Sequence, residues 1–428
     1  MTSVADPTTA PFRGVDPARW PDVARVPVAP LRAAVAAKLL ARLSRRFGVR
    51  VELPGGQLLV AAPANAPVLR LHRPQDFLRR IGAGGLIGFG ESYQAGDWDS
   101  PDLVALLTAL AVDPAAWVPP GTAWLRRLYV QRPPATERGG AQHTRRNIQR
   151  HYDLSNELFA LFLDRTMSYS SALFPTDLAS GAPLADWAAL PGAQHRKIDR
   201  LLDLARVGPG RTVLEIGTGW GELALRAARR GARVVSLTLS AEQLDLARRR
   251  IAEAGLADRA EVRLCDYRSA EGSYDAVVSV EMIEAVGRAY WPAYFATLDR
   301  VLAPGGRVAL QSITMPHRRM LATTDTYTWI LKYIFPGGQI PSTEGLAQAA
   351  ARHSGLRLTA DRGYGGHYAE TLRLWRERFT TRTEEVTALG FDPVFQRMWE
   401  LYLAYSEAGF RTGYLDVRQL LLTREGGR

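Results

Sequence analysis

The chain has 428 residues, with 54 Lys and Arg against 43 Asp and Glu, and a single cysteine, Cys265. This length suits about two to three domains of ordinary size. A hydrophobic content of 46% with 23% charged residues is typical of a globular protein and excludes general disorder. One cysteine excludes an intramolecular disulfide and any zinc or iron–sulfur site built from several cysteines, so we predict no metal site.

The net charge of +11 is concentrated near the N-terminus. Residues 1–150 hold 20 Lys and Arg and 11 Asp and Glu, a net of +9, whereas residues 151–428 hold 34 and 32, a net of +2. Such an excess predicts a surface for an anionic partner, either phospholipid headgroups or nucleic acid. No apolar run reaches ~18 residues, and the start lacks a secretory signal pattern, so we expect a cytoplasmic protein, at most peripheral to the membrane.

Residues 1–30 are rich in Pro, Ala and Val without a period and predict a flexible arm. Residues 30–46, PLRAAVAAKLLARLSRR, predict an amphipathic helix. Two interpretations stay open: a helix on a domain core, or a basic helix on anionic lipid. The apolar positions of this helix, residues 30–46, are Leu31, Val35, Leu39, Leu40 and Leu43, and the basic ones are Arg32, Lys38, Arg42, Arg45 and Arg46.

Residues 50–73 alternate apolar and polar side chains and predict a small antiparallel sheet.

A Gly-rich stretch, an apolar helix and a Pro- and Arg-rich linker follow, and we expect a basic, lipid-binding α+β domain over residues 31–140. In the second domain, residues 141–428, strands and helices alternate from about residue 195. This alternation predicts right-handed crossovers and a parallel, doubly wound α/β sheet. The expected strands are RTVLEIG, ARVVSLTL, AEVRLCDY, YDAVVSVEM and RVALQSIT.

The first of these strands leads into a glycine-rich turn, VLEIGTGWGE, residues 213–222. Glycine allows positive φ and close approach of a ligand to the backbone, and this strand end is the usual ligand-binding edge of such a sheet. The G-x-G-x-G spacing differs from the dinucleotide fingerprint, and the next strand end lacks a ribose-binding acid. Together with the later CDY and APGG motifs, the pattern resembles class I S-adenosylmethionine (SAM) methyltransferases with a Rossmann-like fold.

More specific segments surround this core. RRNIQRHYDLSNELFALFLDRTMSYSSALF (residues 145–174), EMIEAVG, YIFPGG and HYAETLRLWRERF resemble the cyclopropane-fatty-acyl-phospholipid synthases and mycolic acid cyclopropane synthases. The upstream LIGFGESYQAGDW resembles the N-terminal domain of the phospholipid enzymes. VEMIEAVG and MWELYLAYSEAGFRTGYLDV look most like the actinobacterial tuberculostearate-type branch, which makes 10-methylene or 10-methyl fatty acids.

The resemblance implies a SAM site and an adjacent active site. Glu284 and Tyr368 match the family's active-site glutamate and tyrosine, in a pocket where family members hold bicarbonate as the proposed base. Three positions depart from the family: Ser171 replaces Cys, Gln311 replaces His and Glu281 replaces Gly. Glu281 would repel a bicarbonate at close range, so it is interpreted as a replacement base or as a stabiliser of a cation. The residues implied to bind SAM are Tyr169, Ser170, Glu215, Gly217, Gly219, Gly221, Thr238, Leu239, Gln243, Asp266 and Tyr267.

The implied activity is SAM-dependent methylation of the cis double bond of oleoyl-type phospholipids through a carbocation, giving a 10-methylene chain, the precursor of a 10-methyl chain. Two alternatives are a cyclopropane synthase on the same substrate and a small-molecule methyltransferase. Reduction to a methyl group needs hydride, so we expect a separate flavin- or NADPH-dependent reductase partner.

The partner of the basic region follows from the same resemblance. Nucleic-acid methyltransferases normally carry an Asp/Asn-Pro-Pro-aromatic motif or a Pro-Cys nucleophile after the fourth strand. This chain has VSVEMIE there, so we expect no nucleic-acid partner. The basic region is then assigned to an anionic phospholipid surface at the inner face of the plasma membrane. A homodimer stays open.

Overall fold

The computed structural model describes residues 14–113, 155–324 and 326–424. The chain divides into two compact units. Unit 1 comprises Met1–Gln131, Tyr327–Tyr333 and Gly390–Ala408, and unit 2 comprises the remainder. Residues 1–13 of the predicted arm, the predicted linker and the first ten residues of the family segment 145–174 lie outside the described residues. Residues 14–30 of the predicted flexible arm are described, and they contain a short helix, Pro21–Ala24, in which Val23 is buried.

Unit 1 contains a four-stranded sheet in the order β2-β1-β3-β4. β1 pairs antiparallel with β2 but parallel with β3, and β3 pairs antiparallel with β4. The predicted antiparallel sheet was therefore wrong at one pairing, because β3 lies on the edge of β1 opposite β2 and runs in the direction of β1. The strands are β1 (Arg50–Glu52), β2 (Leu58–Val60), β3 (Val68–Leu71) and β4 (Trp98–Asp99).

The predicted basic helix is confirmed as α2 (Pro30–Phe47), which ends at Gly48 in the left-handed conformation, with φ 65°. Its C-terminal half is anchored, since Leu43 and Ser44 are buried. Its first turns differ from the expectation of an apolar face on a core, because Leu31 is 84% exposed and Val35 is 57% exposed. The other helices of this part are α1 (Pro21–Ala24), α3 (Pro74–Gly84), α4 (Leu86–Gln94) and α5 (Leu103–Ala111).

Two segments from late in the sequence also belong to unit 1: α15 (Trp329–Tyr333) and most of α19 (Pro393–Arg411). The indole of Trp329 lies directly against Gly90, where an added Cβ would come within 2.3 Å of the ring. Its Nε1 donates a hydrogen bond of 2.7 Å to Gln94 Oε1. A glycine at position 90 therefore lets α15 dock against α4.

Replacing Gly90 with alanine should lower the free energy of unfolding by about 1–3 kcal/mol, because the methyl group would overlap a buried ring. Gly84→Ala is the matched control: nothing lies within 4 Å of a Cβ at this helical position, so its effect should be neutral or stabilising by up to about 1 kcal/mol. The measurement is the midpoint of urea unfolding. Equal midpoints for the two variants would contradict the proposed packing of α15.

Unit 2 is built on a seven-stranded sheet in the order β10-β11-β9-β8-β5-β6-β7. The five predicted strands form its parallel part, whereas β11 runs antiparallel to both β9 and β10. Because the chain passes from β5 outward to β6 and β7 and then returns to β8, the strand order reverses between β5 and β8. The strands are β5 (Thr212–Ile216), β6 (Arg233–Thr238), β7 (Ala260–Leu264), β8 (Tyr274–Val280), β9 (Leu302–Thr314), β10 (Leu356–Gly363) and β11 (Asp416–Arg424).

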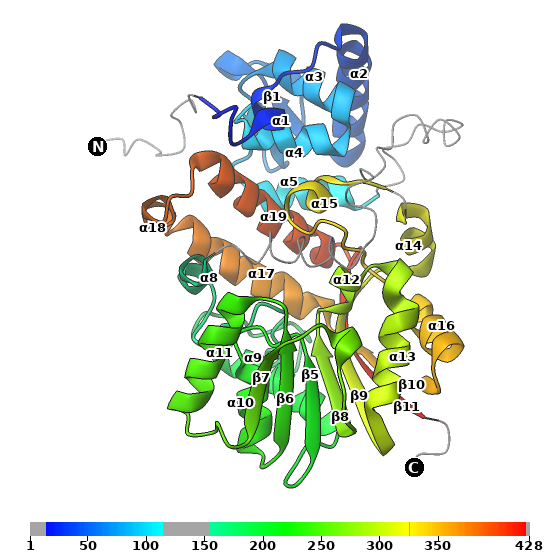
Figure 1. Ribbon diagram of the computed structural model, residues 1–428. Helices are drawn as coiled ribbons and strands as arrows, with labels where there is room; N and C mark the ends of the chain where they lie inside the picture. The colour runs from blue at the N-terminus through cyan, green and yellow to red at the C-terminus, as the bar shows by residue number, and fades with distance from the viewer. Residues whose placement is uncertain (1–13, 114–154, 325, 425–428) are drawn as a thin grey trace. The chain divides into compact units, whose positions relative to one another are not determined.

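Helices cover both faces of this sheet (Figure 1). One apolar core joins the sheet to α9, α10 and α11, and a second core joins the opposite face to α13 and α16. These helices are α9 (Leu190–Leu204), α10 (Glu222–Arg229), α11 (Ala241–Glu253), α13 (Trp291–Val301) and α16 (Thr343–His353). The others are α8 (Asn156–Phe162), α12 (Ile283–Val286), α14 (His317–Thr323), α17 (Gly365–Thr380) and α18 (Thr383–Ala388).

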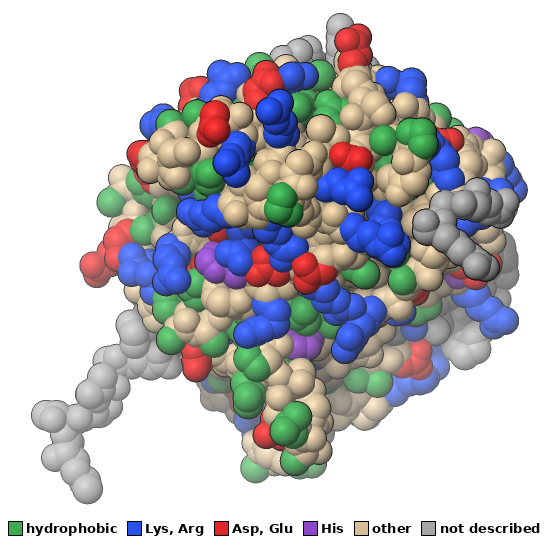
Figure 2. Space-filling view, turned by 90° about the horizontal axis from the view of Figure 1, so that it is seen from below, with side chains coloured by type: hydrophobic (Ala, Val, Ile, Leu, Met, Phe, Trp, Pro, Cys, Tyr) green, Lys and Arg blue, Asp and Glu red, His purple; other side chains and the backbone are tan. Residues whose placement is uncertain are grey.

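The surface seen in Figure 2 mixes basic and acidic side chains. This mixture agrees with the small net charge of residues 151–428, which form most of unit 2. Among the helices that the structure describes, none combines the length and the apolarity needed to cross a membrane.

Candidate active site

The glycine-rich turn links β5 to α10. Gly217, Gly219 and Gly221 all have positive φ (95°, 52° and 89°), a conformation that other residues rarely adopt. A Cβ on Gly219 would meet nothing within 4 Å, whereas a Cβ on Gly221 would come within 3.1 Å of Ala247 Cβ. Gly221, which was expected to contact the cofactor, therefore allows α10 to pack against α11 and does not line the cavity described next.

A cavity of about 180 Å³ opens at the carboxyl ends of β5, β6 and β8, next to the point where the strand order reverses. This is the usual ligand-binding edge of a doubly wound sheet. Glu281 from the end of β8 also lines the cavity. Every other residue expected to bind the cofactor lines it as well: Tyr169, Ser170, Glu215, Gly217, Gly219, Thr238, Leu239, Gln243, Asp266 and Tyr267.

Glu215 forms the buried acidic wall of this cavity. Ser236 Oγ donates a hydrogen bond of 2.5 Å to Glu215 Oε2, and burial raises the pKa of Glu215 to about 8. Further along the wall, Thr238 Oγ1 donates a hydrogen bond of 2.9 Å to Gln243 Oε1. These contacts hold polar oxygens of both strand ends in fixed positions.

The raised pKa of Glu215 predicts a dependence of stability on pH. The folded chain keeps this proton up to about pH 8, whereas the unfolded chain loses it near the ordinary value of 4.5. Stability is therefore greatest below the unfolded pKa and falls as pH rises through that range. Glu215→Gln should flatten this fall, measured as the melting temperature of the SAM-free protein at several pH values. The control is Glu253→Gln on the surface of α11, and an equal slope in both variants would contradict the prediction.

Glu281 is the centre of a polar cluster and adopts positive φ, 49°. Its Oε1 accepts hydrogen bonds from Ser171 N (3.0 Å) and Gln311 Nε2 (2.7 Å), and its Oε2 accepts one from Tyr368 OH (2.7 Å). Four of the five predicted catalytic residues thus lie together. Burial raises the pKa of the Glu281 carboxyl, and these three donors act in the opposite direction. The contact made by Ser171 is through its backbone, since its hydroxyl donates to Ala172 O.

Glu284, the fifth predicted catalytic residue, is held separately. Its Oε1 accepts hydrogen bonds from Ser312 Oγ (2.8 Å) and Ile313 N (2.5 Å). Burial and the nearby charge of Glu281 raise the pKa of Glu284 to about 8. The higher pKa favours the neutral acid of Glu284, whereas three hydrogen-bond donors favour the carboxylate form of Glu281.

Sequence reasoning missed three residues of this site. Lys197 is 1% exposed, lines the cofactor cavity and donates a hydrogen bond of 2.6 Å to Ser170 Oγ, and burial lowers its pKa to about 8. Tyr364 OH and Gln419 Nε2 both donate to Gln311 Oε1, at 2.7 and 3.2 Å. They thereby turn the amide NH₂ of Gln311 toward Glu281. A signal existed for Lys197 alone, because it interrupts the apolar stripe of α9.

Aromatic rings continue from this cluster. The ring centroids of Tyr169 and Trp375 lie 5.4 Å apart, those of Trp375 and Tyr368 lie 6.3 Å apart, and those of Tyr368 and Phe410 lie 4.5 Å apart. Trp375 is fully buried. Of these rings, Tyr169 lines the cofactor cavity. Aromatic faces stabilise positive charge, so a ring at this position suits chemistry in which a cation develops.

The glycine-rich turn with open space beside Gly219, the acidic strand end and the polar side chains after β6 and β7 suit a nucleoside linked to an amino acid. This arrangement defines a SAM-dependent methyltransferase with a class I Rossmann-like fold, whose cofactor is SAM. The residues that would hold it are those lining the cavity of about 180 Å³.

The chain belongs to the mycolic acid cyclopropane synthetase family, whose profile matches residues 140–420. It is 55% identical over 419 residues to the tuberculostearic acid methyltransferase UfaA1 of Mycobacterium tuberculosis, covering 97% of this chain and 98% of that protein. It is 31% identical over 378 residues to the cyclopropane-fatty-acyl-phospholipid synthase of Escherichia coli, covering 85% and 90% of the two chains.

Solved structures agree with this family. The cyclopropane synthase MmaA2 from M. tuberculosis superposes with a TM-score of 0.58 at 33% identity, covering 65% of this chain and 97% of that one. The mycolic acid cyclopropane synthase CmaA1, complexed with SAH and CTAB, gives a TM-score of 0.58 at 31% identity with the same coverage. The family and cofactor expected from the sequence are thereby confirmed.

Proposed function

We propose that this protein methylates the cis double bond of an unsaturated, oleoyl-type acyl chain in a membrane phospholipid and forms a 10-methylene chain, the precursor of a 10-methyl chain. The observation that carries the proposal is the carboxylate of Glu281, held by three hydrogen-bond donors beside the cofactor cavity. The 55% identity to a tuberculostearic acid methyltransferase supports the type of product.

When bound, SAM supplies an electrophilic methyl group. A new C–C bond forms between this methyl group and one alkene carbon as the methyl–sulfur bond breaks. The electron pair of the broken bond leaves with the sulfur, and the positive charge appears on the neighbouring alkene carbon. A hydride shift moves that charge to the methylated carbon, and Glu281 then accepts a proton from the new methyl group, which leaves an exocyclic C=CH₂. Buried aromatic walls exclude water that would trap the cation, and Glu281 and Tyr368 provide negative and π density near it.

The alternative product, a cyclopropane, arises if the methyl proton leaves before the hydride shift. The position of the base relative to the cation decides between the two outcomes. In this chain the base is fixed at the end of β8 by Ser171, Gln311 and Tyr368. We propose that this placement favours the methylene product. Glu281 occupies the place among these donors that a bicarbonate would need, so no step requires that ion.

The test uses purified protein, SAM and vesicles of dioleoyl phosphatidylglycerol. The lipid should gain 14 mass units, and proton NMR should show exocyclic methylene protons. Cyclopropane ring protons would instead support the cyclopropane alternative. If neither lipid product forms, the result would favour a small-molecule methyltransferase. Saturation of the methylene requires hydride, so a saturated methyl product from purified protein alone would contradict the need for a separate flavin- or NADPH-dependent reductase.

We further propose that the basic N-terminal region, residues 31–140, holds the enzyme at the anionic inner face of the plasma membrane, as a peripheral cytoplasmic protein. In α2, exposed Leu31 and Val35 accompany exposed basic residues, and the helix contains no acidic residue. Apolar insertion and attraction to anionic headgroups act together in interfacial helices of this kind. The basic residues are Arg32, Lys38, Arg42, Arg45 and Arg46.

A further inference from the structure

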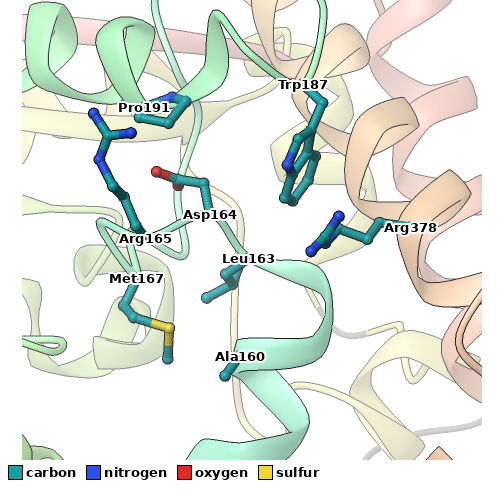
Figure 3. Close-up of a pocket in the computed structure, with 8 residues that line it drawn as sticks. All are labelled: Ala160, Leu163, Asp164, Arg165, Met167, Trp187, Pro191 and Arg378. Atoms are coloured by element: carbon teal, nitrogen blue, oxygen red, sulfur yellow. The ribbon is translucent and has the colours of Figure 1, made fainter. Parts of the chain in front are cut away.

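Unit 2 contains a second cavity, of about 320 Å³, which the active site described above does not use (Figure 3). Its walls come from α8, from the segment that follows α8, from Trp187 and the start of α9, and from α17. Met167 lines both this cavity and the cofactor cavity. The second cavity therefore adjoins the cofactor cavity.

Two arginines give this cavity a positive character. Arg165 and Arg378 stand on opposite sides of it in Figure 3. Neither forms an ion pair with any residue that the structure describes, and the Nε of Arg378 is buried without a hydrogen-bond partner there. The guanidinium of Arg378 is fixed by stacking at 4.1 Å from the Trp187 ring centroid. A guanidinium group without an ion-pair partner is a strong donor toward phosphate oxygens. Of the two, Arg378 is held by its ring contact, whereas Arg165 is exposed.

The acidic residue of the cavity does not cancel this charge locally. Asp164 is 4% exposed, and its carboxylate accepts hydrogen bonds from Thr166 N and Oγ1 at 3.0 and 2.9 Å. One carboxylate against two guanidinium groups leaves a net positive cavity. Leu163 and Met167 add an apolar side. Together these groups suit an anion attached to an apolar chain.

The spacing along α17 agrees with this ligand. Tyr368, which binds Glu281, and Arg378 lie ten residues apart on the same helix, which corresponds to about 15 Å along the helix axis. One leaflet of a bilayer contributes about 15 Å of hydrocarbon, so a double bond midway along an acyl chain lies on the order of 10 Å from its headgroup. The two separations are of the same order.

We propose that this cavity binds the phosphodiester of the phospholipid substrate through Arg165 and Arg378, and so sets the position of the acyl double bond at the methyl donor. This inference rests on the proposed function and names the part of the substrate that the enzyme recognises. Trp187 acts as a positioning residue for the guanidinium of Arg378.

The test compares dioleoyl phosphatidylglycerol with dioleoylglycerol, which has the same acyl chains and no phosphodiester, in neutral detergent micelles with SAM. The double variant Arg165→Gln/Arg378→Gln should raise KM for the phospholipid roughly 10- to 100-fold, while KM for SAM stays unchanged. The variant should therefore lose its preference for the phospholipid over dioleoylglycerol. Arg165→Lys/Arg378→Lys should recover part of it. The matched control, Arg229→Gln/Arg249→Gln, removes two exposed arginines of unit 2 and should retain the preference.

Equal losses on both lipids, or an unchanged KM, would overturn the proposal. Inorganic phosphate should compete only weakly; strong competition that depends on the two arginines, without any lipid preference, would assign the cavity to free phosphate and also overturn it. Calorimetric titration with soluble dihexanoyl phosphatidylglycerol separates this inference from the proposed function. Arginine-dependent binding without methyl transfer to any oleoyl lipid would support the cavity while refuting the proposed reaction.

Discussion

Replacing Glu281 with glutamine is expected to lower kcat for acyl methylation by about 10²- to 10⁴-fold, because the proton acceptor is removed. The affinity for SAM should stay within a few-fold, since the glycine-rich turn and the side chains after β6 and β7 are untouched. Lipid mass spectrometry measures the first quantity and calorimetric titration the second. Near-normal turnover would show that the proton leaves by another route, with Glu284 the nearest candidate.

A second variant separates catalysis from misfolding. A glutamine can keep its oxygen toward Ser171 N and Gln311 Nε2 only if the Tyr368 hydroxyl turns to accept from its NH₂ group. Glu281→Gly removes the side chain altogether and suits the positive φ of the position, 49°. The space it leaves is bordered by those donors, and added bicarbonate should restore part of the activity. The exposed Glu253→Gln serves as the unaffected control.

Neutralising the basic face of α2 should weaken binding to anionic vesicles by about 100-fold in the triple variant Lys38→Gln/Arg42→Gln/Arg45→Gln, at about 1 kcal/mol for each charge. Arg46 should contribute less, because it already pairs with Asp113 at 2.7 Å. The loss should shrink at high salt, since screening weakens the interaction in the parent protein. SAM affinity should not change.

Cosedimentation with vesicles containing phosphatidylglycerol measures this binding. The control is again Arg229→Gln/Arg249→Gln, which removes two exposed charges from unit 2, against three from α2. Binding that falls by the same factor for each charge removed in the two variants would show that total charge, and not α2, directs the protein to the membrane. Substituting exposed Leu31 and Val35 with serine should weaken binding in a way that salt does not remove.

The sequence by itself determined the architecture of the catalytic part. Each strand and helix of the parallel sheet has its own apolar period, and the glycine turn after Glu215 is a local pattern, so both were predicted correctly. The family followed from contiguous segments for the same reason. Substitutions at Ser171, Glu281 and Gln311 indicated a candidate active site because the resemblance supplied the residues that they replace.

Only the tertiary structure decided how those residues act on one another. Tyr364 and Gln419 orient Gln311 from 53 and 108 residues away, and Tyr368 reaches Glu281 across 87 residues. The parallel pairing of β1 with β3 and the docking of α15 on Gly90 are likewise contacts between separate segments. A local sequence pattern predicts which face of a helix or strand is apolar, but it does not predict which distant polar group will contact that helix or strand. Packing of the whole chain brings the donors together around one carboxylate.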